Sequence, residues 1–252
     1  MAFALQNIIE VLKALQERGI TNPFLQIGIL ATIAKESGFE PKQEYSYKNT
    51  SNQRLRDLFG TRLASYSDDQ LTALKQDDIK FFDAIYGGRY GNDQPGDGNK
   101  YKGRGFNQVT FKDLYQKYGN LIGVDLVSKP ERLNEVPIAA KVAAAYFSKS
   151  LESGKGKIAS RYNVTDLSAI NDSTLATQIA VNANAGWGKD TRGGFAEDAA
   201  MKFLDQVTAI HSNIYKSVIA TIQKKKYWVI AGVIVILVIA GTLVYIYVIK
   251  KK

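Results

Sequence analysis

The chain has 252 residues, of which 45% are hydrophobic and 23% charged, so it is long enough for one sizeable globular domain and an appendage. It has no cysteine and one histidine, His211, which excludes a disulfide framework, a cysteine-ligated metal and a multi-histidine zinc site. The formal charge of +9 includes two lysine triplets, at 224–226 and 250–252. Without them the chain has 27 basic and 24 acidic residues, a near balance that does not indicate nucleic-acid binding.

Residues 1–223 are predicted to form a mainly helical domain, because apolar residues recur there at helical spacing. A first helix ends at Gly19, and a second begins after Thr21 or Asn22, with Pro23 at the first helical position. That second helix is predicted to run from Phe24 to about Glu36. Further helices are predicted over 52–63, 68–75, 77–86, 111–118, 137–151, 172–184 and 195–223, the last amphipathic and including His211, which we interpret as a surface or packing residue.

Four segments between these helices are predicted to be irregular. They are the loop 37–51, the glycine-rich loop 87–105, a turn at 153–157 and a second glycine-rich loop at 185–194. The loop 87–105 is too rich in turn-forming residues for a helix but could hold a short hairpin. A structureless segment of this length in a compact domain usually has a function.

Two glutamates stand eight residues apart, Glu36 at the end of a predicted helix and Glu44 in the loop that follows. Cleavage of a glycosidic bond usually takes two carboxyl groups in different environments, one that donates a proton and one that activates water. Glu36 ends an apolar helix face and is expected to be partly buried, although a solvated helix end fits the periodicity equally well. The sequence Gly-Arg-Gly-Phe-Asn-Gln-Val-Thr follows at 103–110.

Three elements in this order resemble glycoside hydrolase family 19, specifically its phage endolysin branch. They are Glu-Ser-Gly-Phe from Glu36, Glu-Tyr-Ser-Tyr from Glu44, and Tyr-Lys-Gly-Arg-Gly-Phe-Asn-Gln-Val-Thr from Tyr101. The resemblance covers about residues 25–120 well and 137–205 loosely. It implies a helical, lysozyme-like fold with a long active-site loop.

Carried over by position, the resemblance implies that Glu36 is the general acid, that Glu44 is the general base and that Thr50 helps to hold the attacking water. It also implies a set of sugar-binding residues: Tyr47, Arg104, Gln108, Thr110, Asn182 and Arg192. The aromatic ring of Tyr101 offers a further face to an N-acetyl sugar ring. One position departs from the family pattern, because Leu114 stands where the family usually has an asparagine. Nothing in the sequence calls for a metal or an organic cofactor.

The expected activity is inverting hydrolysis of the β-1,4 bond between N-acetyl sugars of peptidoglycan, with glycan strands as the partner. Glu36 and the residues after it also resemble the Glu-Ser-x-Phe-x-Pro element of lytic transglycosylases, which use one glutamate and no water nucleophile. A third alternative is a non-catalytic protein that holds cell wall to a membrane. Chitin ranks lower as a substrate, because a chitinase has no obvious need for a bilayer anchor.

Residues 227–249 are predicted to cross a membrane once. They are 23 residues without charge or proline, and as a helix they would span about 35 Å, enough for a bilayer. Aromatic residues mark both ends of the segment, as at membrane interfaces: Tyr227 and Trp228 at one end, Tyr245 and Tyr247 at the other. The sequence thus predicts a catalytic domain at 1–223 and a transmembrane anchor with flanking lysines at 224–252.

Residues 1–18 lack the basic start and the unbroken apolar run of a secretory signal, so none is expected. A C-terminal anchor without a signal would leave the domain in the cytoplasm, away from the cell wall. One hypothesis that resolves this conflict is a phage whose virion contains an internal lipid membrane. The enzyme would then lie in that membrane, among virion membrane or capsid proteins, and act in genome entry or lysis.

Overall fold

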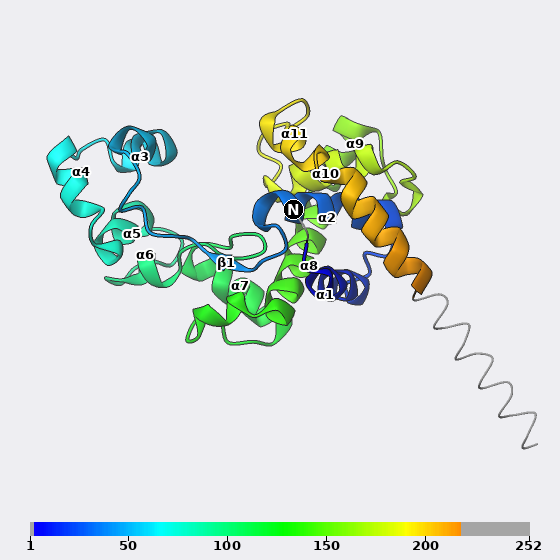
Figure 1. The fold of residues 1–252 in the computed structure, drawn as a ribbon, viewed down its shortest axis with the longest axis horizontal. Coiled ribbons are helices and arrows are strands. Elements are labelled where there is room, and N and C mark those ends of the chain that lie inside the picture. The colour runs from blue at the N-terminus through cyan, green and yellow to red at the C-terminus, as the bar shows by residue number, and fades with distance from the viewer. Residues whose placement is uncertain (1–2, 218–252) are drawn as a thin grey trace, which may run out of the picture. The chain divides into compact units, whose positions relative to one another are not determined.

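A computed structural model of the chain describes residues 3–217, which are mainly helical as predicted. The chain divides into two compact units, 1–207 and 208–252, of which the second is described only to residue 217 and is helical there. The predicted domain boundary at residue 223 lies outside the described residues. The α-helices are α1 (Leu5–Glu17), α2 (Pro23–Ser37), α3 (Asn52–Phe59), α4 (Asp68–Leu74), α5 (Asp78–Tyr86), α6 (Asp97–Lys100), α7 (Lys112–Ile122), α8 (Val136–Ser153), α9 (Lys155–Tyr162), α10 (Ser173–Asn184) and α11 (Phe195–Met201) (Figure 1).

Helix α2 lies at the centre of the main core. Asn22 caps its N-terminus by accepting a hydrogen bond from the backbone of Leu25, and Pro23 occupies the first turn as predicted. Residues 25–34 are all buried, so the helix is enclosed on nearly every side rather than along one stripe. Helix α10 packs closely on it, and α1, α8 and α11 complete this core.

Gly28 permits the close approach of α2 and α10. A Cβ atom at this position would lie 2.5 Å from the backbone carbonyl carbon and oxygen of Ala176. No real side chain tolerates that distance to a backbone, so only glycine lets the two helices pack as they do. This packing matters for the site, because Glu36 near the end of α2 and Asn184 at the end of α10 contact each other.

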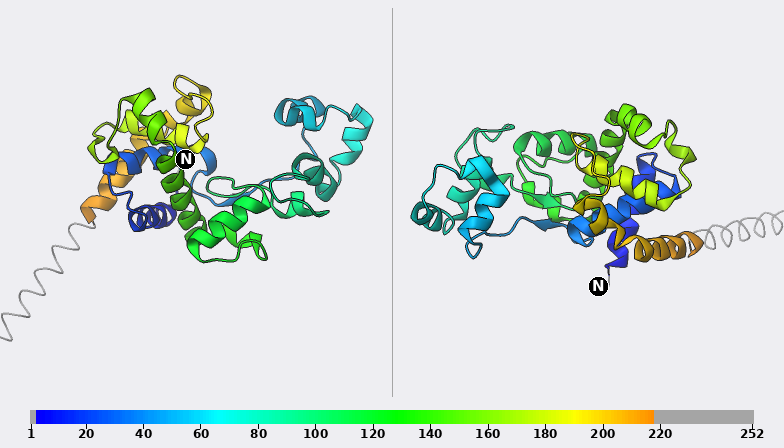
Figure 2. Two further views of the ribbon diagram at one scale, coloured as in Figure 1. Left: turned by 180° about the vertical axis from the view of Figure 1, so that it is seen from behind. Right: turned by 90° about the horizontal axis from the view of Figure 1, so that it is seen from above.

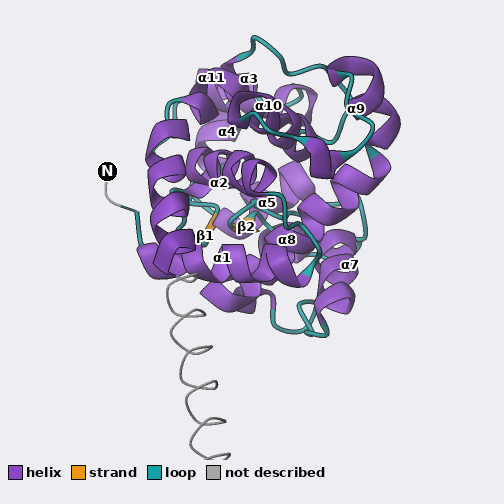
Figure 3. Cartoon of the chain, turned by 90° about the vertical axis from the view of Figure 1, so that its right-hand side faces the viewer, coloured by secondary structure: helices purple, strands orange, loops and turns teal. Residues whose placement is uncertain are grey.

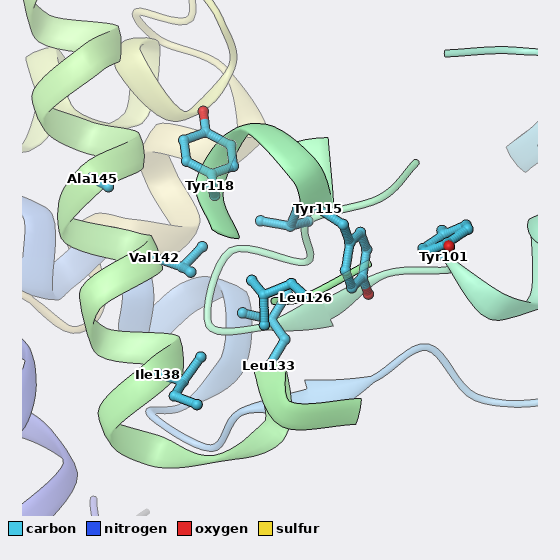
Figure 4. Packing of buried hydrophobic residues seen from close by; sticks show 9 residues of the cluster. Tyr101, Tyr115, Tyr118, Leu126, Leu133, Ile138, Val142 and Ala145 are labelled. Atoms are coloured by element: carbon cyan, nitrogen blue, oxygen red, sulfur yellow. The ribbon is translucent and has the colours of Figure 1, made fainter. Parts of the chain in front are cut away.

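Two further clusters of buried residues lie away from α2. The first joins α3, α4 and α5 with the 3-10 helix η1 (Gly60–Arg62), and it includes Leu55, Phe81 and Phe82. The second lies between α7, α8 and the 3-10 helix η2 (Pro130–Asn134); it includes Leu133 and Val142, and the Tyr115 ring is directed toward Tyr101 (Figure 4). Within residues 3–207, helices α3–α5 stand on one side of the two strands, and α2 and α10 on the other (Figure 2).

A two-stranded antiparallel sheet connects these parts. Strand β1 (Lys42–Gln43) pairs with β2 (Arg104–Gly105), with Lys42 opposite Gly105 and Gln43 opposite Arg104 (Figure 3). The backbone N–H of Glu44 extends this ladder by donating to the carbonyl of Gly103 at 2.7 Å. The sheet therefore brings the loop after α2 against the Gly-Arg-Gly segment sixty residues further along the chain.

Besides the strand β1 in the loop predicted at 37–51, three predicted segments differ in the structure. The glycine-rich loop 87–105 contains the single turn of helix α6, which was predicted to be absent. The carboxylate of Asp83 accepts hydrogen bonds from the backbone of Gly96 and Gly98, and this satisfies N–H groups that a free glycine-rich loop would leave to water. The turn predicted at 153–157 is instead the start of α9, and the long helix predicted over 195–223 breaks after Met201 and resumes at residue 204.

The predicted transmembrane segment 227–249 lies outside the described residues. Among residues 3–217, no helix has the length and apolar character that a bilayer crossing requires.

Candidate active site

A pocket of about 400 Å³ contains both candidate catalytic glutamates. Its wall also includes Tyr45, Tyr47, Thr50 and Gln108, which come from the loop after α2 and from the segment after β2. Glu36 reaches the pocket from the last turn of α2, and Glu44 from the residue after β1. Five of the residues that the motifs singled out therefore lie around one cavity: Glu36, Glu44, Tyr47, Thr50 and Gln108.

Three donors surround the Glu44 carboxylate. The Tyr47 hydroxyl donates to Oε1 at 2.7 Å, and the Tyr86 hydroxyl lies 2.9 Å from Oε1 and 3.0 Å from Oε2. The backbone N–H of Gly103 donates to Oε2 at 3.2 Å. An ionised carboxylate can accept from all of these groups at once, and they hold its orientation in the pocket.

The hydroxyls of Tyr47 and Tyr86 remain hydrogen-bond donors because they are partly buried beside a carboxylate. Burial, and then the adjacent Glu44 carboxylate, raise the pKa of the Tyr86 hydroxyl well above its ordinary value. Burial and Glu44 raise the pKa of Tyr47 in the same way. Both hydroxyls thus keep their protons through the neutral and mildly alkaline range, and Glu44 accepts from them.

Glu36 has a different environment. Its side chain is 22% exposed, which agrees with the expected partial burial. Lys35 Nζ lies 2.5 Å from Oε1, and the Asn184 amide nitrogen donates to the same oxygen at 2.9 Å. In the described part of the chain, Oε2 makes no hydrogen bond to protein. The two glutamates thus differ in their contacts: one oxygen of Glu36 accepts from no protein donor among the described residues, whereas both oxygens of Glu44 accept hydrogen bonds.

Gly103 has no side chain, and this lets Glu44 and Gln108 lie close to its backbone. A Cβ there would lie 3.0 Å from Gln108 Oε1 and 3.4 Å from Glu44 Oε2. Gln108 in turn has a positive φ of 52°, and its amide nitrogen donates to the carbonyls of Lys42 and Gly105. Its side chain therefore joins both strands beneath the pocket, and a backbone conformation that glutamine rarely adopts places it there.

A glycosyl hydrolase family 19 domain-containing protein of Haemophilus influenzae is 31% identical to this chain over 154 residues, which cover 57% of this chain and 72% of that protein. The chain belongs to glycosyl hydrolase family 19. No family model matches it.

Two of the residues assigned from the family 19 motif lie in the core rather than at the pocket. The Tyr101 ring is 1% exposed, and its hydroxyl donates to the Val127 carbonyl. Arg104 is 7% exposed and donates to the carbonyl of Lys100 and the hydroxyl of Tyr115. Both side chains hold the segment around β2 in place and are turned away from the pocket, contrary to the predicted role in sugar binding.

Thr110 and Leu114 follow in the same motif. Thr110 donates to the carbonyl of Gln108, and its hydroxyl would lie 3.5 Å from a Cβ at Gly103, which puts it beside the pocket wall. Leu114, at the position where the family pattern has asparagine, packs against the buried cluster between α7 and α8. This departure from the family motif therefore has a local packing role.

Asn182 and Arg192 belong to a different cluster. Asn182 is fully buried, accepts from Arg161 and donates to the Tyr162 hydroxyl. Arg192 is exposed, pairs with Asp190 and donates to the carbonyl of Arg161. These hydrogen bonds connect Asn182 and the loop 185–194 to α9. Neither Asn182 nor Arg192 lines the pocket of the two glutamates.

Three residues whose side chains contact the glutamates directly were not predicted: Lys35, Tyr86 and Asn184. Tyr86 ends α5 and contacts Glu44 across 42 residues of sequence, a contact that no local pattern signals. Asn184 contacts Glu36, whereas the sequence predicts a role for Asn182, two residues earlier on α10. Residues two apart on a helix point to different sides, so only one asparagine could face Glu36, and the sequence does not say which.

Proposed function

We propose that the protein is a glycosidase that hydrolyses the β-1,4 bond between N-acetyl sugars of peptidoglycan with inversion. Glu36 donates a proton to the leaving oxygen, and Glu44 takes a proton from the attacking water, which Thr50 helps to hold. The observation that carries this proposal is that both glutamates line one pocket in contrasting hydrogen-bonding environments. Membership of family 19 supports the same chemistry.

Sugar rings would contact the pocket wall through Tyr45, Tyr47 and Gln108. The Tyr45 ring is 70% exposed at the pocket and offers an apolar face to the ring of an N-acetyl sugar. An inverting enzyme keeps its carboxyls about 6.5–9.5 Å apart, so that one water fits opposite the leaving group.

The proposal is tested with purified protein on purified peptidoglycan. Hydrolysis releases reducing ends, and inversion gives the α-anomer, which NMR of the first products detects. Glu36→Gln and Glu44→Gln should each lower turnover by about 10²–10⁴-fold, because each removes a proton-transfer group. If Glu44→Gln keeps wild-type turnover and the products carry anhydro sugars, the protein is a lytic transglycosylase that uses Glu36 alone.

The same assay separates a catalytic from a binding role. Wild-type protein that sediments with peptidoglycan but releases no fragment would support the non-catalytic, wall-binding alternative. Cleavage of chitin oligomers in preference to peptidoglycan would identify chitin as the substrate, while leaving the proposed roles of the two glutamates unchanged.

We further propose that residues 227–249 anchor the enzyme in a lipid bilayer, and that this bilayer is the internal membrane of a phage virion. The support is the uncharged 23-residue segment between two lysine triplets. The full chain should sediment with lipid vesicles, whereas a chain that ends at residue 223 should stay in the supernatant. Proteomics of purified particles tests the virion location; presence only in infected-cell membranes late in lysis would contradict it.

A further inference from the structure

Two asparagines form a chain of hydrogen bonds that ends on Glu36. Asn107 Nδ2 donates to Asn184 Oδ1 at 2.9 Å, and Asn184 Nδ2 donates to Glu36 Oε1 at 2.9 Å. Asn107 lies in the segment after β2, Asn184 is the last residue of α10, and Glu36 lies in the last turn of α2. The chain thus joins three elements that are far apart in sequence.

The first link fixes which way the Asn184 amide faces. If that amide turned over, its carbonyl oxygen would face the Glu36 carboxylate and its NH₂ group would face the NH₂ group of Asn107. Both contacts would then be repulsive, so the donation from Asn107 keeps the Asn184 N–H directed at Glu36. The backbone is held as well, because the Tyr146 hydroxyl donates to the Asn184 carbonyl at 2.8 Å.

The position of Asn107 leaves one of its side-chain atoms without a hydrogen bond in the part of the chain that the structure describes. Its Oδ1 is buried and has no hydrogen-bond partner among the described residues. Buried polar atoms are nearly always paired, and an exception in a native protein calls for an explanation. Within residues 3–217, the Asn107 side chain engages Asn184 alone, which indicates that its amide serves to orient Asn184.

Both donors at Glu36, Lys35 and Asn184, engage the same oxygen, Oε1. Oε1 therefore serves as an acceptor, and a proton that Glu36 carries belongs on Oε2. We propose that Asn184, oriented by Asn107, is the positioning residue that turns the Glu36 carboxyl so that Oε2 delivers the proton to the leaving oxygen. This inference rests on the proposed function, in which Glu36 is the acid.

The test compares kcat and KM of Asn184→Ala, Asn107→Ala and the double variant on soluble peptidoglycan fragments. Asn184→Ala should lower kcat by about 10- to 100-fold with KM within about twofold, because a misplaced catalytic group slows chemistry rather than binding. Asn107→Ala should lower kcat less. Since Asn107 acts only through Asn184, it should cause no further loss in the Asn184→Ala background.

Ser150→Ala is the matched control. The Ser150 hydroxyl donates to the carbonyl of Ala183, one residue before Asn184, but touches neither glutamate. It should lower the Tm and leave kcat at the wild-type value, which separates loss of stability from loss of positioning. Thermal unfolding of every variant identifies any that fails to fold, and Asn107→Ala tests the idea from a second element.

Three results would overturn the positioning role: wild-type kcat in Asn184→Ala, a loss confined to KM, or multiplicative effects in the double variant. Glu36→Gln, measured alongside, distinguishes this outcome from failure of the proposed function. If Glu36→Gln is inactive while Asn184→Ala is fully active, only the positioning role is wrong. If Glu36→Gln keeps wild-type turnover, the acid itself is misassigned and the positioning role is overturned with it.

Discussion

At the scale of single residues, hydrogen-bond donors hold Glu44, the residue that we propose as the base. A base needs its carboxylate ionised, oriented and close to water, and donors from Tyr47, Tyr86 and the Gly103 backbone supply the orientation. Tyr47 comes from the same loop as Glu44, whereas Tyr86 comes from the end of α5. The position of Glu44 therefore depends on the packing of α3–α5 as well as on the sheet.

Tyr86→Phe tests this dependence. A hydrogen bond to a charged group contributes about 1.5–3 kcal/mol, and Tyr47 and Gly103 remain, so kcat should fall by about tenfold. Steady-state kinetics on peptidoglycan fragments give the value. Tyr66→Phe is the control, since Tyr66 packs against the same buried cluster without contacting Glu44, and it should keep wild-type kcat. Equal kcat in the two variants would contradict the role of Tyr86.

At the scale of elements, the contact between α2 and α10 determines where Glu36 and Asn184 meet. The two side chains stand at the ends of helices that touch through Gly28 and Ala176, about two helical turns earlier on each helix. A change in the separation of α2 and α10 would therefore displace Glu36 and Asn184 at the pocket. Gly28 is far enough from the pocket that its substitution removes no functional group.

Gly28→Ala should force the helices apart or strain them, with a cost of about 1–3 kcal/mol, the range for overpacked cores. For a domain of this size we expect the Tm to fall by about 2–4 °C per kcal/mol, measured by calorimetry. The matched control is Gly156→Ala in α9, where a Cβ would meet no atom within 4 Å. Alanine favours a helix over glycine, so this control should be neutral or slightly stabilising. A Tm for Gly28→Ala equal to the control's would contradict the close approach.

At the scale of the whole molecule, buried tyrosines link the fold to pH. Burial is the first cause that raises the pKa of Tyr118 to about 12, and it also raises the pKa values of Tyr47, Tyr86 and Tyr115. Each of these groups ionises more readily in the unfolded chain, where its pKa is near 10. The free energy of folding that depends on them is therefore fully present below about pH 10 and is lost as the pH rises toward the folded-state values.

We accordingly expect the free energy of unfolding, and with it the Tm, to fall as the pH rises above about 10. The free energy of unfolding should fall by up to about 1.4 kcal/mol per pH unit for one fully buried tyrosine and by less for the half-buried Tyr47. Tyr118→Phe should reduce this slope, because it removes one such group while the ring stays in its cluster. Calorimetry across the pH series measures both. A Tm that is flat to about pH 11, or an unchanged slope in the variant, would refute the linkage.

Much of the local structure could be read from the sequence, because it depends on neighbours along the chain. The start of α2 followed from Asn22 and Pro23. Helix α10 begins at Ser173, one residue after its predicted start, because the Asp172 side chain caps it by accepting from the Leu175 backbone. The spacing of Glu36 and Glu44 and the Gly-Arg-Gly motif indicated family 19. Helix α6 escaped prediction, because Asp83, fourteen residues before it, binds the backbone N–H groups that a glycine-rich segment exposes.

What the sequence by itself determined is the set of chemical groups: two carboxyls, their order, and the short motifs that carry them. Only the tertiary structure decided which other side chains reach those carboxyls. Tyr86, Asn107 and Asn184 contact the site from separate elements, while Tyr101 and Arg104, from the same motif as Gln108, turn into the core. The physical reason is that the direction of a side chain depends on the packing of its element against the rest of the molecule, which no local pattern encodes.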